Sequence, residues 1–453
     1  MGTVAERCWE ALESTFAGRR VVLAGMPVAG GAPLVPVLRR VGVERVLIVG
    51  SGIGTGPLPD PDDAEWVTID ALAPDPVAEF RLVERILADP PADVRHALAR
   101  FDPARKAILL MAPFQAITDL DGRAVFGGRR PEWVALEDKT TNDELFDAAG
   151  IARPASEVVP ADRGALLAAA ARLDQGAGTV WAGDARDGFN GGGVFVRWLR
   201  PDAPDAHVRE AVAFLAPRCD RVRVAPFLDG IPCSIHGLVA EDGVAAVRPV
   251  EMVTLRQPST NRLRYAGTAT FWDPPDADRE VMRAAVRRAG RLLDERVGYR
   301  GTFGIDGVLT AGGWLPTELN PRFGAGVGQL GRAVGDVPLS LLHAVLVETG
   351  RLPVAVDELE RFLVEATDAN RAGGGWTTVE RRWDESEEHE IPGGTLLLGP
   401  SAVGGFVRFT PAPSAVDVGA SVAPAAAAAF AHADRHFDAG IGPLEPAPDL
   451  SRR

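Results

Sequence analysis

Apolar and polar positions in the first part of the chain alternate between two patterns. Short unbroken apolar runs, typical of buried strands, are separated by segments in which apolar residues recur with helical spacing. The predicted strands are residues 19–25 (RRVVLAG), 43–50 (VERVLIVG) and 107–111, and the predicted helices are 32–42 (APLVPVLRRVG) and 77–87. This alternation predicts an open α/β domain that covers residues 1–132.

The rest of the chain has a more mixed pattern. Residues 140–149 have the spacing of a helix that ends at Gly150, and residues 276–297 that of a long amphipathic helix. A helix is also predicted at 337–349, after two strands described below. From residue 352 on, glycine-bounded strands and an alanine-rich helix at 422–436 predict a small α+β domain. The expected fold is therefore α/β plus α+β, divided into residues 1–132, 133–351 and 352–453.

The composition narrows the class of protein. With 453 residues, 46% of them hydrophobic and 24% charged, the chain is too long for one ordinary core. No apolar run is long enough to span a bilayer, so we expect no membrane. The net charge of −14 without a basic stripe argues against nucleic acid. The three widely spaced cysteines and the acidic, amphipathic N-terminus favour a cytoplasmic protein. A homodimer is left open.

Lysine is rare in this chain. Of 48 basic residues only Lys106 and Lys139 are lysines. A lysine that persists in such an arginine-rich sequence is a candidate for a role that needs a compact ammonium group, which the planar guanidinium of arginine does not imitate.

The segment from Tyr299 to Gly326 (YRGTFGIDGVLTAGGWLPTELNPRFGAG) carries the clearest chemistry. It predicts two strands, 301–309 and 314–320, joined by the Ala-Gly-Gly turn. Glu318 and Asn320 are two positions apart on a strand and share a face. A hairpin brings Asp306 toward that face. Three oxygen ligands with Arg322 beside them indicate a site for Mg²⁺, or Mn²⁺, between protein and phosphates.

Two glycine-rich stretches invite a phosphate-binding interpretation. Gly50, Gly52, Gly54 and Gly56 imitate a dinucleotide fingerprint, but Pro57 follows where a helix should begin, so we interpret this stretch as a loop. Residues 187–193 (DGFNGGG) lie between two predicted strands, and their backbone N–H groups can approach phosphate oxygens. A disordered turn is the alternative. A P-loop is excluded because neither lysine follows a glycine.

Taken with Asp138-Lys139 and Gly150-Ile151-Ala152-Arg153-Pro154, these motifs resemble the ATP-grasp superfamily, whose metal-binding pattern is an acidic residue followed by Glu-x-Asn-Pro-Arg. The resemblance covers nearly the whole chain. It implies an ATP-grasp fold with an N-terminal open α/β (pre-ATP-grasp) domain and a small C-terminal domain. The first domain and the sequence GAGVGQLGRA after the metal motif are most similar to the pheganomycin-type peptide ligases.

The resemblance implies roles for individual residues. Asp306, Glu318 and Asn320 would hold the metal, and Lys139 would neutralise the α- and β-phosphates. Arg322 would stabilise the transferred phosphoryl group. ATP would further contact a glycine loop and an adenine hinge; the expected residues are Gly188, Asn190, Gly191, Gly192, Ala225, Phe227 and Leu228. Arg248, in an arginine-rich region that extends to Arg264, is a candidate for binding the carboxylate of the acyl donor.

The sequence departs from the family pattern at two positions. The family usually has a second lysine near Trp181 and Ala182, where this chain has none, so either an arginine such as Arg186 takes its place or the contact is lost. The usual ribose-binding glutamate would fall near Pro232 and is also absent. A plain helix cap at Lys139, a buried hairpin at residues 221–237 and a solvated loop around Arg256 remain the alternatives.

The resemblance implies an ATP-dependent carboxylate–amine ligase that forms an amide bond through an acylphosphate, in secondary-metabolite biosynthesis such as that of antibiotics. The expected partners are an amino acid or N-modified amino acid as acyl donor and an amino acid or peptide as amine acceptor. Two alternatives stay open: an ATP-grasp enzyme with a thiol or other acceptor, and a nucleotide-binding regulator without catalysis.

Overall fold

The computed structural model describes residues 2–69, 71–186, 188, 191–260, 262–335 and 337–446. Its N-terminal part is an open parallel sheet in the order β3-β2-β1-β4, as the alternating pattern predicts. The strands are β1 (Arg20–Ala24), β2 (Arg45–Gly50), β3 (Ala64–Thr68) and β4 (Ile108–Met111). The helices of this part are α1 (Val4–Phe16), α2 (Val28–Gly31), α3 (Leu34–Arg40), α4 (Pro76–Ala88) and α5 (Ala92–Phe101).

A short connection leads from this sheet to the centre of the chain. It contains β5 (Asp119–Leu120), β6 (Arg123–Ala124), α6 (Pro131–Val134) and the 3₁₀ turn η1 (Ala135–Glu137). An antiparallel sheet follows in the order β7-β10-β8-β9, and α8 packs on it. Its elements are α7 (Asn142–Ala148), β7 (Glu157–Pro160), α8 (Arg163–Leu173), β8 (Thr179–Gly183), β9 (Val196–Leu199), α9 (Asp205–Leu215) and β10 (Arg221–Pro226).

The largest sheet runs in the order β14-β13-β11-β15-β16, and β12 and β21 pair at its sides. Helix α10 covers one face because its apolar residues recur every three or four positions and are buried there, for example Met282, Val286 and Leu293. The elements are β11 (Gly230–Ala240), β12 (Gly243–Ala246), β13 (Val250–Gln257), β14 (Arg262–Ala269), α10 (Asp276–Val297), β15 (Gly301–Thr310), β16 (Gly313–Asn320) and β21 (Glu445–Pro446).

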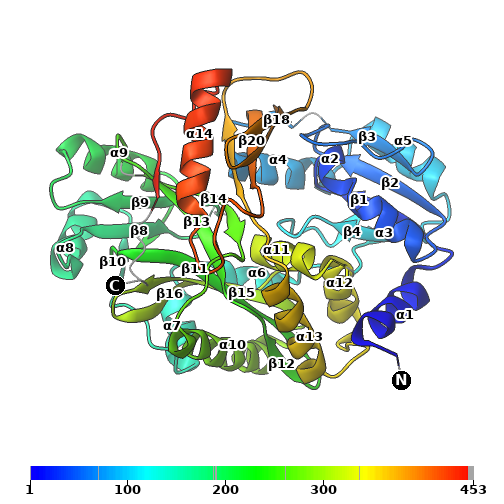
Figure 1. Cartoon of the computed structure of the whole chain (residues 1–453), viewed down its shortest axis with the longest axis horizontal. Helices are drawn as coiled ribbons and strands as arrows, with labels where there is room; N and C mark the ends of the chain where they lie inside the picture. The colour runs from blue at the N-terminus through cyan, green and yellow to red at the C-terminus, as the bar shows by residue number, and fades with distance from the viewer. Residues whose placement is uncertain are drawn as a thin grey trace.

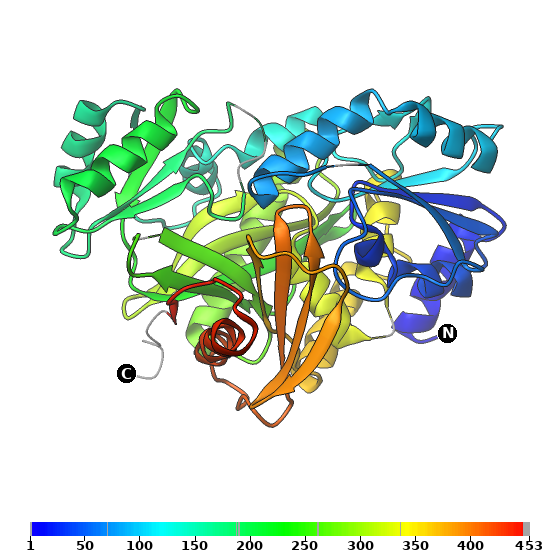
Figure 2. The same ribbon diagram turned by 90° about the horizontal axis from the view of Figure 1, so that it is seen from above.

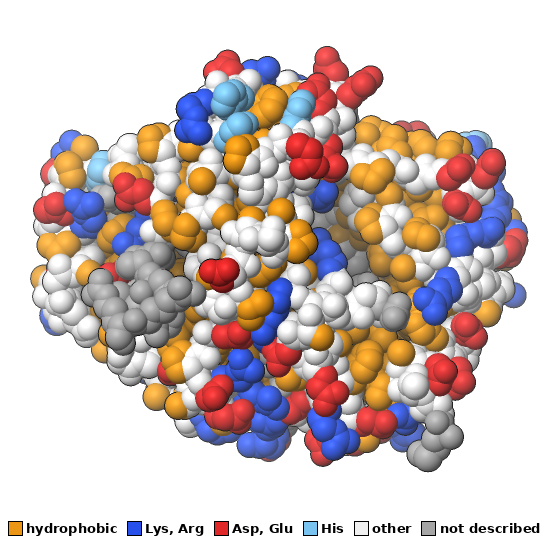
Figure 3. Space-filling view, in the orientation of Figure 1, with side chains coloured by type: hydrophobic (Ala, Val, Ile, Leu, Met, Phe, Trp, Pro, Cys, Tyr) orange, Lys and Arg blue, Asp and Glu red, His pale blue; other side chains and the backbone are white. Residues whose placement is uncertain are grey.

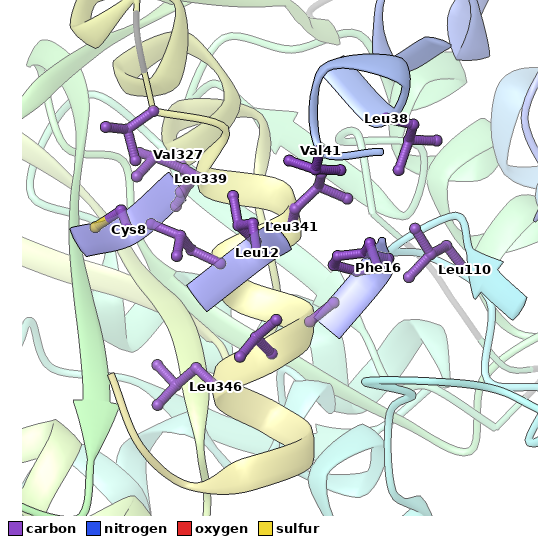
Figure 4. Packing of buried hydrophobic residues seen from close by; sticks show 14 of the residues in the cluster. Cys8, Leu12, Phe16, Leu38, Val41, Leu110, Val327, Leu339, Leu341 and Leu346 are labelled. Carbon is purple, nitrogen blue, oxygen red and sulfur yellow. The ribbon is translucent and has the colours of Figure 1, made fainter. Parts of the chain in front are cut away.

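Three helices follow the hairpin of β15 and β16: α11 (Ala325–Val334), α12 (Leu339–Thr349) and α13 (Val356–Ala369). Figure 4 shows side chains of α1, among them Leu12 and Phe16, packed against Leu341 of α12. The side chains of α13 join this core as well. The first residues of the predicted C-terminal domain, from 352 on, therefore pack with the N-terminal half of the molecule.

The last part of the chain is an antiparallel sheet in the order β17-β20-β19-β18, on which α14 packs. It comprises β17 (Gly375–Val379), β18 (Glu387–Ile391), β19 (Gly394–Ser401), β20 (Gly404–Pro411) and α14 (Ala423–Phe437). Figures 1 and 2 show this sheet between the central sheets and the N-terminal domain. Thr55 Oγ1 donates a hydrogen bond to the Pro400 carbonyl (2.6 Å), so the first and last parts of the chain touch.

Among the described residues, no single helix is long and apolar enough to cross a membrane. The bent pair α11 and α12 meets the length and composition test only together, across a turn of 118°.

Candidate nucleotide and metal site

A cavity of about 1140 Å³ lies where the sheets meet. Its walls come from α4, from the sheet around β8 and β10, from the large sheet, from the start of α11 and from β17. Basic side chains outnumber acidic ones along the walls. The bases are Lys139, Arg197, Arg223, Arg256, Arg262, Arg264, Arg322 and Arg381, and the acids are Asp75, Asp306, Glu318, Glu380 and Asp438. In a chain with a net charge of −14, such a lining favours anionic ligands.

On the face that Figure 3 draws, Lys and Arg atoms lie in a recess beside the N-terminal domain, and basic and acidic side chains are interspersed over the outer surface.

The strands β15 and β16 bring the predicted metal ligands together. Asp306 lies directly opposite Glu318, and Gly304 lies opposite Asn320. A bulge just after Asp306 accommodates one extra residue on β16, and Asn320 Nδ2 donates a hydrogen bond to Asp306 Oδ2 at 3.0 Å. All three side chains line the cavity.

The electrostatics of this hairpin indicate a place for a cation. Burial and the nearby charge of Glu318 raise the pKa of Asp306 to about 6, although Ser234, Arg322 and Lys139 act in the opposite direction. Two carboxylates and one amide oxygen are the hard ligands that Mg²⁺ prefers, and a divalent ion would relieve the repulsion between the carboxylates. The residues present therefore fit this metal. Among the described residues there is no cluster of three His, Cys, Asp or Glu side chains that would suggest a different metal centre.

Lys139 contacts the metal hairpin directly. Its Nζ lies 2.7 Å from Glu318 Oε1, and only 5% of the residue is exposed. Asp138, its neighbour, accepts hydrogen bonds from the backbone and hydroxyl of Thr140, which fixes the turn that leads into α7. Because Lys139 is buried and contacts Glu318, it is not a solvent-facing lysine at a helix cap, which was the alternative.

Arg322 lies at the end of the hairpin. Its NH2 donates to Asn320 Oδ1 at 3.1 Å, its Nε lies 3.0 Å from Glu137 Oε1, and its guanidinium lies over the ring of Phe114. The residue lines the cavity. These contacts hold the positive charge next to the predicted metal ligands.

The glycine loop lies only partly along the cavity. Gly191 and Gly192 line it, and Gly192 and Gly193 both have positive φ angles (64° and 77°), which a residue with a side chain adopts at a cost. Gly188 is not among the lining residues; its carbonyl accepts a hydrogen bond from Arg81 of α4 at 3.3 Å. Asn190 lies outside the described residues.

The predicted adenine hinge follows β10. Ala225, Phe227 and Leu228 all line the cavity. The N–H of Phe227 is already donated to the Gly178 carbonyl (2.9 Å), and Ala225 pairs with Val180 in the ladder to β8. Leu228 is therefore the hinge residue whose backbone we expect to meet an adenine edge.

The glycines at positions 50 to 56 do not form a phosphate site. The first N–H groups of α2 are donated to the carbonyls of Gly52 and Ile53, at 2.9 Å each. These loop carbonyls occupy the place that a pyrophosphate would take in a dinucleotide-binding domain. The loop interpretation made from Pro57 is consistent with this contact.

Two arginines lie elsewhere than the sequence suggested. Arg248 is only 2% exposed, does not line the cavity, and is neutralised by Asp273 and Asp368, while its NH2 donates to the Trp272 carbonyl. This corrects the prediction that Arg248 binds a donor carboxylate, because its charge joins the segment before β13 to the segment before α10 and to α13. Arg186 pairs with Asp220 (3.0 Å) and is also outside the lining.

Sequence reasoning missed two cavity residues on β11. Ser234 Oγ and His236 Nε2 lie 3.2 Å apart, and burial lowers the pKa of His236 to about 3. His236 packs against Gly326 at the start of α11. The signal available was the alternation in CSIHG, which puts both side chains on one face of a strand.

Neither a family model nor a curated protein matches this sequence. Solved structures do match the fold. An ADP complex of N5-carboxyaminoimidazole ribonucleotide synthetase superposes with a TM-score of 0.54 at 14% identity, covering 93% of this chain and 98% of that one.

Two further matches are informative. The biotin carboxylase domain of the Hydrogenobacter thermophilus 2-oxoglutarate carboxylase, solved with MgADP, ADP and bicarbonate, has a TM-score of 0.54 at 12% identity, covering 87% and 86%. An L-amino acid ligase from Bacillus licheniformis has a TM-score of 0.50 at 13% identity and covers 95% and 98%. Together with the arrangement of sheets described above, these similarities show that the chain has the ATP-grasp fold.

Proposed function

We propose that the protein is an ATP-dependent carboxylate–amine ligase that releases ADP and phosphate. The observation that carries the proposal is the contact between Lys139 and Glu318, which lie 179 positions apart in the sequence. It joins the rare lysine to a hairpin with two carboxylates, an amide and Arg322, all at the wall of one cavity. Such a site suits a nucleoside triphosphate with a divalent cation.

Asp306, Glu318 and Asn320 would hold Mg²⁺, which when bound supplies positive charge to the phosphate oxygens. Lys139 would neutralise phosphate charge, and it would exchange its present partner Glu318 for phosphate oxygens. Arg322 would stabilise negative charge on the transferred phosphoryl group, because its guanidinium is held beside Asn320. Gly191 and Gly192 would offer backbone N–H groups from the loop.

The chemistry follows from charge. A carboxylate is a poor electrophile, so the first step transfers the γ-phosphoryl group from ATP to a carboxylate oxygen and releases ADP. The acylphosphate has phosphate as its leaving group. A neutral amine then attacks the acyl carbon, an amide bond forms, and the amine loses its proton. Exclusion of water protects the intermediate from hydrolysis.

A second arginine supports a carboxylate substrate. Arg264 on β14 is part-buried, lines the cavity and donates to Thr377 Oγ1 of β17 at 2.6 Å. Among the described residues, no carboxylate forms an ion pair with it. Burial and the neighbouring Arg262 lower the pKa of Arg264, although the charge of Asp434 acts in the opposite direction. A substrate carboxylate is the group that would form an ion pair with this guanidinium. In the proposal Arg264 therefore replaces Arg248 as the residue that binds the donor carboxylate.

Two similarities favour amino acids as substrates. The sequence resembles the pheganomycin-type ligases, and the fold is similar to that of an L-amino acid ligase. We propose an amino acid or N-modified amino acid as donor and an amino acid or peptide as acceptor. A role in secondary-metabolite peptide biosynthesis rests on the sequence resemblance.

The test is a screen for ADP release with ATP, Mg²⁺ and pairs of amino acids and peptides, with product masses determined. Bicarbonate is included because one similar structure contains it. A new amide formed in equal amount to ADP supports the proposal. A thioester, a carboxylated product or a phosphorylated protein would assign a different reaction, and ATP binding without turnover of any pair would favour a regulator.

A further inference from the structure

Arg223 on β10 is a cavity residue that the sequence did not single out. Only 5% of Arg223 is exposed, and the residue lines the cavity. On the neighbouring strand β8 its partner is Ala182, which lines the cavity too. Arg223 and Ala182 lie on the same face of the sheet, and Ala182 contributes only a methyl group to that face.

The hydrogen bonds of Arg223 are incomplete. Its Nε donates to Asp143 Oδ1 at 2.9 Å, and its NH2 lies 2.8 Å from the same oxygen without forming a hydrogen bond in the described part of the chain. Asp143 is also shared, because Ser156 donates to it (2.6 Å) and Arg153 lies 3.5 Å away. A guanidinium has five N–H donors, and burying them without acceptors is costly.

Arg197 provides a comparison within the same cavity. It is 4% exposed, and its NH1 donates to the carbonyls of Val194 (2.8 Å) and Val196 (3.0 Å), while Glu210 accepts from its Nε at 3.3 Å. Its donors are therefore used within the protein. In Arg223 the NH2 group is buried against Asp143, whereas NH1 has no hydrogen bond in the described part of the chain and is the donor left for an acceptor in the cavity.

We propose that Arg223 binds phosphate oxygens of the bound nucleotide, which lie between Arg223 and Ala182. This inference rests on the proposed function. Phosphate is the acceptor favoured by the surroundings, because Lys139 and the loop glycines Gly191 to Gly193 line the same cavity. The planar guanidinium, oriented by Asp143, can present two N–H groups to one phosphate. Arg223 is thus a nucleotide-binding residue on the strand next to Ala182.

The first experiment compares the binding of ADP and adenosine by calorimetry. Arg223→Ala and Arg223→Gln are expected to weaken ADP binding about tenfold or more and to leave adenosine binding within about twofold. Arg223→Lys keeps the charge and is expected to lose less. The matched control is Arg221→Ala, because Arg221 lies two positions earlier on the same strand and face but is exposed and outside the cavity.

The second experiment moves the charge across the ladder. Ala182→Lys introduced into Arg223→Ala is expected to restore ADP binding at least in part, whereas Val180→Lys, one pleat further along β8, is not. Recovery at position 182 alone supports the position of the phosphate between the two strands.

The outcomes separate this inference from the proposed function. If the wild-type protein binds neither ATP nor ADP, the proposed function fails and the inference fails with it. If the wild-type binds ADP and Arg223→Ala binds it equally well, only the inference fails. The inference is also overturned if Arg223→Ala weakens the binding of ADP and of adenosine equally, or if Ala182→Lys restores no ADP binding. It is overturned as well if Arg223→Ala and Arg223→Gln unfold while Arg223→Lys folds, because the role of Arg223 would then be structural.

Discussion

At the scale of single residues, the charged side chains of the hairpin and Lys139 form hydrogen bonds with one another. Lys139 is held by Glu318, and Asn320 bridges Asp306 and Arg322. A nucleotide and its metal must therefore replace these internal contacts. This exchange makes the effects of individual substitutions distinguishable.

Glu318→Gln tests the metal assignment. The amide has the shape of the carboxylate but no charge, so we expect the protein to fold and to lose the strengthening of ATP binding by Mg²⁺. Calorimetry with Mg²⁺ or with a chelator measures this, and ADP release should fall about a hundredfold or more. Glu280→Gln, on the exposed side of α10, serves as control. A variant that still binds ATP more tightly with Mg²⁺, and releases ADP at the normal rate, would remove Glu318 from the metal site.

Lys139 is expected to be hard to replace even by arginine. With 5% of the residue exposed, there is little room for a planar guanidinium at this position. Lys139→Ala should weaken ATP binding about tenfold or more, and Lys139→Arg should weaken it to a smaller degree. Unchanged ATP affinity in both variants, with both proteins folded, would mean that the phosphates lie elsewhere in the cavity.

At the scale of elements, the start of α11 is constrained by the strand beneath it. A Cβ at Gly326 would lie 2.1 Å from His236 Cε1, whereas one at Gly328 would meet its nearest atom at 3.7 Å. We expect Gly326→Ala to destabilise the fold by about 1–3 kcal/mol and Gly328→Ala to stabilise it by about 0.5–1 kcal/mol. Chemical denaturation of the two variants gives both values. Equal stabilities would show that α11 does not pack on β11 in this way.

His343 connects α12 to β15 and gives a pH dependence. Its Nδ1 accepts the Thr302 N–H at 3.0 Å, and burial with Arg129 nearby lowers its pKa from 6.5 to about 4. Between pH 6.5 and 4, His343 is therefore protonated in the unfolded chain but neutral in the folded chain. The contribution of His343 to the free energy of unfolding is complete above pH 6.5 and is lost as the pH falls toward 4.

Between these pH values the wild type should lose roughly 1–3 kcal/mol more stability than His343→Gln, measured by denaturation at several pH values. His96→Gln, at an exposed histidine of α5, serves as the control variant. Parallel pH profiles for the wild type and His343→Gln would contradict the assignment.

Elements with a strong periodic pattern could be predicted from the sequence. Residues 276–297 form α10 with the expected bounds, and the hairpin pairs Asp306 with Glu318. Helix α11 was missed because Gly326, Gly328 and Gly331 disfavour a helix locally, and packing against the core compensates for that preference. Such compensation comes from tertiary contacts, which local spacing does not contain.

The candidate site divides in the same way. The sequence could single out Lys139 and the predicted ligands of the hairpin because their motifs are local, and the structure brings these residues to one cavity. Arg248 was singled out and Arg223 was not, because local spacing does not show which arginine faces the cavity. The difference between them is made by Asp273 and Asp368, which neutralise the first, and by Ala182 on a neighbouring strand, which leaves the second facing the cavity.

At the scale of the whole molecule, the cavity is formed by parts that are distant in the sequence. Phe80 of α4, Lys139 before α7, Arg264 of β14 and Thr377 of β17 all line it. The hydrogen bond between Thr55 and Pro400 links the first domain to the last sheet. The N-terminal domain, the central sheets and the last sheet therefore each contribute a wall of the same cavity.

The central claim is that a carboxylate is activated by phosphoryl transfer, and trapping with hydroxylamine tests it most directly. The protein is incubated with ATP, Mg²⁺ and candidate acyl donors, without an amine acceptor, and hydroxylamine is added to react with an acylphosphate. We predict a hydroxamate of one donor formed in equal amount to ADP, and its loss in Glu318→Gln. ATP cleavage to AMP, or ADP release by the wild type with no hydroxamate from any donor, would contradict the account.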